Sequence, residues 1–251
     1  MQAITSIAKT TVQAWVRDKT FYSILIISVF VVLCSLFLKE MTLGNRSQVV
    51  HDLGLATILF FGVFMSLFTT TVSVKDKTLY MILTKPIPRF YWIVGNYAGH
   101  VFIVLVNTLV LAGVLYGLSE VLGIPWFSGL NYAIYLIFLE LMIIVAVSLF
   151  FSSFMTSAAL SKFCTLCVVV AGHILEETKN LLSAGAGEVF KPVLTALYYL
   201  LPNFKAFDVK TEAVHQLPIE SSHLEFASVY GLVYVAILII LSSWIFARTE
   251  L

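Results

Sequence analysis

Long apolar runs constrain this chain more than any other feature of its sequence. Its 251 residues are 60% hydrophobic and only 12% charged, and the mean hydropathy is +0.97. Several runs exceed the roughly 18 consecutive apolar residues that mark a membrane-spanning helix. Inside a bilayer the backbone must satisfy its own hydrogen bonds, and a helix does so within one segment. The sequence therefore predicts an all-α integral membrane protein.

Six segments are expected to be transmembrane helices. They are residues 21–38, 53–74, 97–118, 132–154, 162–175 and 228–246, of which the fifth is short for a full crossing. Residues 193–201, before the last span, are apolar but too few to cross, so a re-entrant or interfacial helix is expected there. No cleavable signal peptide is expected, because the first apolar run is too long and no small-x-small cleavage site follows it.

The first residues, 1–19, are expected to form an amphipathic interfacial helix on the cytoplasmic leaflet. One face of this helix is apolar, and positively charged residues lie on the rest of its surface. The apolar face consists of Ile4, Ile7, Ala8, Thr11 and Trp15, and the charges are Lys9, Arg17 and Lys19. A plain basic flank before the first span is the alternative.

Lysine and arginine set the orientation, because they accumulate on the cytoplasmic side of membrane proteins. With both termini cytoplasmic, the inner segments carry Lys9, Arg17, Lys19, Lys75, Lys77, Lys85, Arg89, Lys162 and Arg248. The outer segments then carry Lys39, Arg46, Lys179, Lys191, Lys205 and Lys210. Residues 75–96 are thus expected in the cytoplasm, and residues 176–227 outside as an external cap.

The cytoplasmic loop has the pattern of a docking surface for a soluble partner. Leu79, Ile82 and Leu83 are spaced to form one apolar helical face, and Pro86 and Pro88 end that helix. Beyond the prolines, the next span opens with glycines at positions 95 and 99, a small-xxx-small pattern that permits close helix contact.

This loop also resembles a known family. Thr78-Leu79, then 83–89 (LTKPIPR), then Gly95 resemble the cytoplasmic loop of ATP-binding-cassette type 2 exporter permeases. Asp76 corresponds loosely to the acid of that loop, while Lys77 and Asn96 stand where the family often has Gly and Lys. Residues 200–210 (LLPNFKAFDVK) and 244–251 (WIFARTEL) are similar to further segments of these permeases.

The resemblance implies a single transmembrane permease domain, 1–251, in the cytoplasmic (inner) membrane of a prokaryote. A separate P-loop ATPase would hold ATP and Mg²⁺ and dock on Asp76, Thr78, Leu79, Ile82, Leu83, Lys85, Pro86, Pro88 and Arg89. A second permease copy, identical or related, would complete a pathway lined by the first, second and fifth spans. The substrate would be a lipid, glycan, peptide or drug-like molecule, and this chain would bind no cofactor and no nucleic acid.

Two polar residues within the spans are candidates for the pathway. Glu140 is the one acid well inside a span, and Asn107 could hydrogen-bond with it. An intramembrane carboxylate is costly and should face protein or water. A pathway or gating role and a packing role both remain open for Glu140.

Other chemistry is weakly indicated. No P-loop motif and no G-x-S-x-G motif occurs, so the chain is not expected to be an enzyme. One alternative is an intramembrane lipid-modifying enzyme using His100, Glu140 or His173 with Glu176, although their depths argue against convergence. Another is a non-energised channel or scaffold. Cys164 and Cys167 are expected to be small buried hydrophobes and no metal site is expected.

Overall fold

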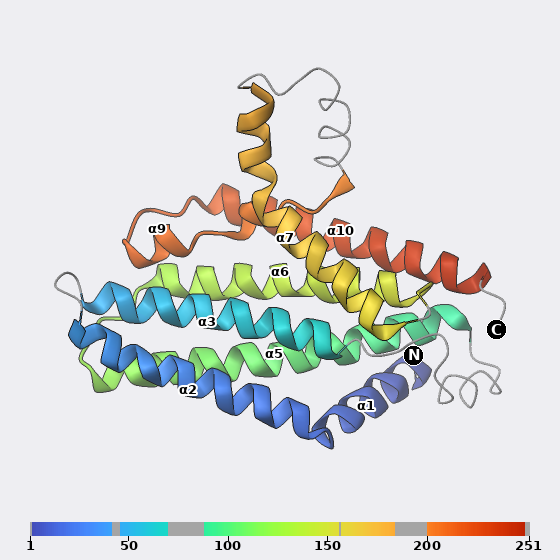
Figure 1. Cartoon of the computed structure of the whole chain (residues 1–251), viewed down its shortest axis with the longest axis horizontal. Coiled ribbons are helices and arrows are strands. Elements are labelled where there is room, and N and C mark those ends of the chain that lie inside the picture. The colour runs from blue at the N-terminus through green and yellow to red at the C-terminus, as the bar shows by residue number, and fades with distance from the viewer. Residues whose placement is uncertain (1, 42–45, 70–87, 156, 184–199, 249–251) are drawn as a thin grey trace.

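The structure is a computed structural model and describes residues 2–41, 46–69, 88–155, 157–183 and 200–248 (Figure 1). Every regular element in these ranges is a helix. They are α1 (Gln2–Val16), α2 (Lys19–Met41), α3 (Arg46–Thr69), α5 (Arg89–Val121), α6 (Ser128–Ser152), α7 (Ala158–Ser183), the short 3₁₀-helix η1 (Phe204–Phe207), α9 (Lys210–Val214) and α10 (Ser221–Arg248). The prediction of an all-α chain is confirmed for the described residues.

Five of these helices, α2, α3, α5, α6 and α10, are long and apolar enough to cross a membrane. Together they indicate a multi-pass membrane protein. The expected fifth span lies in α7, whose apolar part, Ala158–Ile174, is shorter. Two spans begin earlier than predicted, because α5 already starts at Arg89 and includes the apolar residues 90–94, and α10 starts at Ser221 and includes the more polar residues 221–227. The expected re-entrant helix at 193–201 lies almost wholly outside the described residues.

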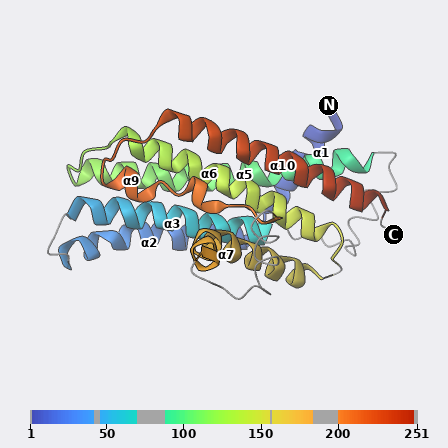
Figure 2. The ribbon, with the colours of Figure 1, turned by 90° about the horizontal axis from the view of Figure 1, so that it is seen from above.

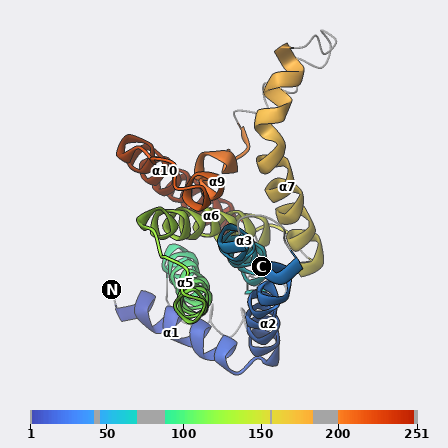
Figure 3. The same ribbon diagram turned by 90° about the vertical axis from the view of Figure 1, so that its left-hand side faces the viewer.

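Helix α6 lies at the centre of the bundle. It packs against α3, α5, α7 and α10, and Figure 3, viewed along the bundle, shows it between α10 on one side and α3 and α5 on the other. Figure 2 shows α10 running beside α6. The apolar window of α6 is 67% buried, against 22% for α2 and 28% for α10. The outer helices therefore expose most of their apolar side chains, as a bilayer would require.

Helix α1 crosses α5 outside the bundle, and the two glycines at the start of α5 make this crossing possible (Figure 1). A Cβ atom at Gly95 would lie 2.8 Å from Ile7 Cβ, and one at Gly99 would lie 2.8 Å from Thr11 Cβ. The Thr11 hydroxyl donates a hydrogen bond to Asn96 Oδ1 over 2.9 Å. The predicted close helix contact at the two glycines is confirmed, and its partner is α1.

The turn from α1 into α2 is fixed by a helix cap. Asp18 Oδ1 accepts a hydrogen bond of 2.8 Å from the backbone N–H of Thr20. That bond satisfies one of the free donors in the first turn of α2 and lowers the pKa of the Asp18 carboxyl. The helix predicted over residues 1–19 is therefore shorter than expected. Helix α1 ends at Val16, and Lys19 already belongs to α2.

One end of the bundle collects the start of α1, the end of α3, the start of α5, the α6–α7 turn and the end of α10 (Figure 1). A single arginine joins two of these segments. Arg89 Nη1 donates to the carbonyl oxygens of Phe246, at 2.8 Å, and Ala247, at 3.2 Å. Cationic donors satisfy the free carbonyls at a helix C-terminus and oppose its dipole, so Arg89 caps α10.

The segment after residue 200 differs from the polar external loop expected between 204 and the last span. Phe204 and Phe207 are 0% and 1% exposed, and η1 and α9 pack against α6. Residues three apart eclipse in a 3₁₀-helix, so both rings point the same way into the bundle. Asn203 Oδ1 accepts from the backbone N–H of Lys205 and caps η1. Two buried aromatic residues, hidden among polar neighbours, thus anchor this part of the expected cap.

We expect Gly95→Val to weaken the α1–α5 crossing, because its side chain would overlap Ile7 and the Ile4 carbonyl oxygen. Overpacking of this kind costs about 1–3 kcal/mol. Thermal unfolding of the purified protein in detergent would measure the loss. Gly113→Val is the matched control, because no atom lies within 4 Å of a Cβ built there. Equal melting temperatures for the two variants would contradict the crossing.

Candidate functional site

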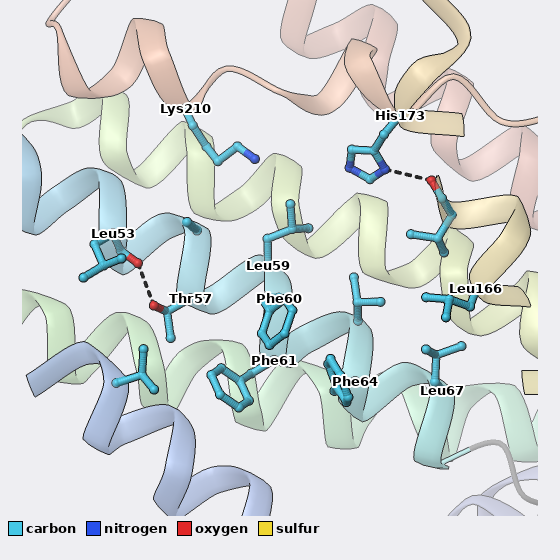
Figure 4. Close-up of a pocket in the computed structure, with 14 residues that line it drawn as sticks. Leu53, Thr57, Leu59, Phe60, Phe61, Phe64, Leu67, Leu166, His173 and Lys210 are labelled. Carbon is cyan, nitrogen blue, oxygen red and sulfur yellow. Dashed lines mark hydrogen bonds between the residues drawn. The ribbon is translucent and has the colours of Figure 1, made fainter. Parts of the chain in front are cut away.

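The candidate site is a cavity of about 600 Å³ on the flank of the bundle, between α2, α3 and α7 (Figure 4). Almost all of its lining side chains are apolar, and Phe60 and Phe64 are exposed, so the cavity opens to the surface. The lining consists of Val31, Leu53, Ala56, Thr57, Leu59, Phe60, Phe61, Val63, Phe64, Leu67, Leu166, Val169, His173 and Lys210. Its ionisable side chains are His173 from α7 and Lys210 from α9.

Next to this wall lies a pair of ionisable residues, of which Glu140 is buried and His173 is partly exposed. His173 Nε2 is 3.1 Å from Glu140 Oε1, and the Glu140 side chain is 2% exposed. Glu140 comes from the middle of α6 and is not among the residues that line the cavity, whereas His173 is. The carboxyl group therefore faces protein, as its position in a span requires.

The convergence of Glu140 and His173 corrects the expectation that their depths would keep them apart. The two helices follow one another in the chain and pack together, with α6 ending at Ser152 and α7 beginning at Ala158. At a rise of 1.5 Å per residue, Glu140 and His173 each lie roughly 20 Å from these adjoining helix ends. The sequence reading failed because it treated the fifth span as short and placed His173 at its outer end. In the structure α7 continues to Ser183, so His173 lies within the helix.

Gly172 lets α7 approach η1 and fixes the position of the next residue. A Cβ atom at Gly172 would lie 2.6 Å from the Pro202 carbonyl oxygen and 2.5 Å from Phe204 Cδ2. The His173 ring in turn lies 5.3 Å from the Phe204 ring, centroid to centroid. The buried phenylalanine of η1 and the bare backbone of α7 thus hold the imidazole against α6.

Glu140 Oε1 has the ion-pair contact with His173 but no hydrogen-bond partner among the described residues, so the protonation of the pair is inferred from the contacts of the imidazole. His173 Nδ1 lies 2.9 Å from the Val169 carbonyl oxygen, which can only accept, so Nδ1 carries a hydrogen. The approach of Nε2 to the carboxyl oxygen then needs one further proton, on the ring or on the carboxyl. In both arrangements the pair is neutral overall. It therefore adds no net charge to the cavity.

The remaining charge at the cavity wall belongs to Lys210. Its Nζ lies 3.3 Å from Asp208 Oδ1, and the side chains are 20% and 41% exposed, respectively. Figure 4 shows the Lys210 side chain extending along the cavity toward His173. Neither Lys210 nor the Asp208–Lys210 pair was singled out from the sequence as a site. The FKAFDVK segment carries the signal, because aromatic residues spaced to bury η1 bring Lys210 to the bundle.

The predicted partner of Glu140, Asn107, lies elsewhere. Asn107 on α5 is fully buried, and no hydrogen-bond partner of its side-chain amide is found among the described residues. The neighbouring Thr108 Oγ1 is likewise buried and has no hydrogen-bond partner among the described residues. His100, also on α5, bonds the Asn96 carbonyl oxygen through Nδ1 at 2.7 Å and does not join Glu140. The structure thus gives Glu140 a histidine partner from α7 in place of Asn107.

Most of the residues predicted to couple to an ATPase lie outside the described residues. These are Asp76, Thr78, Leu79, Ile82, Leu83, Lys85 and Pro86. Pro88 is described and immediately precedes α5, with φ −55° and ψ 132°. Arg89 caps α10 as described above. Its contact with a partner stays a prediction.

Metal ligands do not gather in the part of the chain that the structure describes, where no group of three His, Cys, Asp or Glu side chains is found. Cys164 is half-buried and Cys167 is exposed, and both are free thiols. The expectation that both are buried is therefore wrong for Cys167, which faces away from the bundle.

Comparison with known proteins does not assign the chain to a family. No protein-family model matches it, and no curated protein matches its sequence. The structure indicates a multi-pass membrane protein with an apolar cavity beside a Glu–His pair and a lysine.

A double-mutant cycle tests the Glu140–His173 pair. We expect His173→Leu to lower the free energy of unfolding by about 1–3 kcal/mol, because it leaves a buried carboxyl without its partner. Adding Glu140→Leu should restore much of that loss, since removing both partners of a buried contact is far less costly than removing one. Thermal unfolding of the four proteins gives the coupling energy. Strictly additive effects would mean that the two side chains do not interact.

Proposed function

We propose that this chain is the membrane-spanning permease subunit of an ATP-binding-cassette exporter, powered by a separate ATPase subunit. The observation that carries the proposal is the location of the cavity. It lies between α2, α3 and α7, which contain the first, second and fifth predicted spans. These are the spans that the loop resemblance implies for the pathway. None of the residues that line the cavity belongs to that loop.

The arrangement of the bundle ends supports the same proposal. The loop that resembles the family's coupling loop joins α3 to α5, and both of its attachment points lie at the end of the bundle that holds α1 and the end of α10 (Figure 1). Cationic residues of the described chain gather there, namely Lys9, Arg17, Lys19, Arg89, Lys162 and Arg248. The positive-inside rule makes this end cytoplasmic, where a soluble ATPase would be. We therefore propose six spans, cytoplasmic termini and a prokaryotic inner membrane.

A second permease copy fits the open flank of the bundle. Phe60 and Phe64 of α3 line the cavity and are exposed. A pathway between two copies would be closed laterally by the partner. The chain itself would then bind no nucleotide, since it contains no P-loop motif.

An intramembrane enzyme is the second candidate, because Glu140 and His173 do converge beside an apolar cavity. Two features argue against it. Both ring nitrogens of His173 contact protein atoms, and Glu140 does not line the cavity. Lipid turnover by the purified chain without an ATPase would favour the enzyme, and its absence together with ATPase copurification would favour the permease.

The orientation can be tested by labelling single cysteines in a cysteine-free background. We expect cysteines replacing Asn45, Ser128 and Thr211 to react with an impermeant maleimide in intact cells, because these positions lie on the proposed outer side. A cysteine at Thr84 should react only after permeabilisation. External labelling at Thr84 would overturn the orientation and the docking argument with it.

The docking loop can be tested by copurification. Leu83→Asp should release the ATPase, because it places an unpaired carboxylate in an apolar contact whose loss can cost about 2 kcal/mol or more. Leu217→Asp is the matched control, since Leu217 is 54% exposed in the α9–α10 connection at the other end of the bundle. Retention of the ATPase by the Leu83 variant at wild-type stoichiometry would exclude this loop as the docking site.

Substitution of the two prolines should affect a different step from substitution of the apolar face. Pro86→Gly with Pro88→Gly removes the restriction on the backbone before α5 but leaves Leu79, Ile82 and Leu83 in place. We expect the ATPase to remain bound and to hydrolyse ATP while transport falls. Loss of the ATPase from this variant would assign the prolines to docking rather than to coupling.

A further inference from the structure

The floor of the cavity is a long apolar surface. The lining residues of α3 run from Leu53 to Leu67, which is about 21 Å along the helix at 1.5 Å per residue. Phe60 and Phe64 lie on it with ring centroids 4.9 Å apart, and they are 57% and 38% exposed. A surface of this length and composition suits a hydrocarbon chain laid along the helix.

A cation lies at one end of this surface. Lys210 enters from α9 above the Leu53–Leu59 part of α3, and its ammonium group extends along the cavity (Figure 4). Its contact with Asp208 uses one of three N–H donors, and the Asp208 side chain is 41% exposed to solvent. The pair is partly exposed, and the two remaining N–H donors of the ammonium can bind a second anionic partner.

The rest of the polar wall does not offset this charge. The Glu140–His173 pair is neutral, and both of its ring nitrogens contact protein atoms. The Thr57 hydroxyl donates to the Leu53 carbonyl oxygen over 2.6 Å. The cavity therefore presents the Lys210 ammonium, paired with Asp208, at the α9 end and hydrocarbon along the remainder.

We propose that the cavity binds an anionic amphiphile, with its carboxylate or phosphate head at Lys210 and its hydrocarbon chain along α3 toward Leu67. A neutral apolar occupant would leave the Asp208–Lys210 pair beside hydrocarbon without a further polar contact, which is unfavourable in a membrane. A cationic head would be repelled by Lys210. That this ligand is the exporter's cargo rests on the proposed function, whereas its binding to the cavity does not.

The probe is a 16-carbon fatty acid with a diazirine near the end of its chain, used with the purified full-length protein in detergent micelles. We expect photolabelling at residues of α3 around Phe64 and Leu67, because the head would lie at the opposite end of the cavity. The methyl ester of the same probe is the control for charge. It should label about tenfold less well, since it lacks the charge-assisted contact with Lys210.

Variants separate the head contact from the chain contact. Lys210→Gln should lower labelling by the acid about tenfold and leave labelling by the ester unchanged. Lys210→Arg should keep the preference for the acid. Lys205→Gln is the matched control, because Lys205 lies in the same segment and does not line the cavity. Ala56→Trp should reduce labelling by both probes, since Ala56 lies on the cavity floor, and thermal unfolding checks that it folds.

Several outcomes would overturn the proposal. Equal labelling by acid and ester, or no effect of Lys210→Gln, would show that the charge does not select the ligand. Quantitative disulfide cross-linking of two copies through Phe60→Cys, with no labelling by the acid, would assign the cavity to a second copy of the chain. Charge-selective labelling without ATPase copurification would sustain this site and reject the exporter. ATPase copurification without charge-selective labelling would do the reverse.

Discussion

The enclosure of α6 is the constraint on which the rest of the bundle depends. A helix that is apolar on all sides has to be surrounded, and α6 is, by α3, α5, α7 and α10 together with η1 and α9. Its one ionisable residue can be tolerated only because the neighbouring helix supplies a partner at the same depth. The acid of α6 is thus paired within the protein, whereas the buried side chains of Asn107 and Thr108 have no hydrogen-bond partner among the described residues.

The same constraint explains which parts of the fold could be read from the sequence. Runs of apolar residues are long enough to predict membrane helices without any tertiary information. The glycines at 95 and 99 predicted a close helix crossing. They could not name α1 as the partner, since a glycine pair shows where a helix can be approached but not by what. The predicted starts of α5 and α10 were too late, because α5 also includes the apolar residues 90–94 and α10 also includes the more polar residues 221–227.

The candidate site was harder to foresee, because it is assembled from side chains that carry weak signals alone. Glu140 was conspicuous as a buried acid, but its partner depended on the length of α7 and on the α6–α7 turn. The sequence around Lys210 resembles an ordinary polar loop. Lys210 reaches the cavity because the buried side chains of Phe204 and Phe207 hold η1 against the bundle, and α9 packs beside it. Spacing along one helix predicts a shared face well, whereas contacts between helices require a register that the sequence does not state.

The cap that Arg89 places on α10 gives the bundle a mechanical joint. The guanidinium group holds the last carbonyls of α10, and Trp92 of α5 stacks on Phe246 with ring centroids 5.1 Å apart. The first turn of α5 cannot shift without breaking these contacts or carrying the end of α10 with it. A displacement of Pro88 would therefore move α5 and, through these contacts, the end of α10. Helix α10 packs along the side of α6 opposite the cavity.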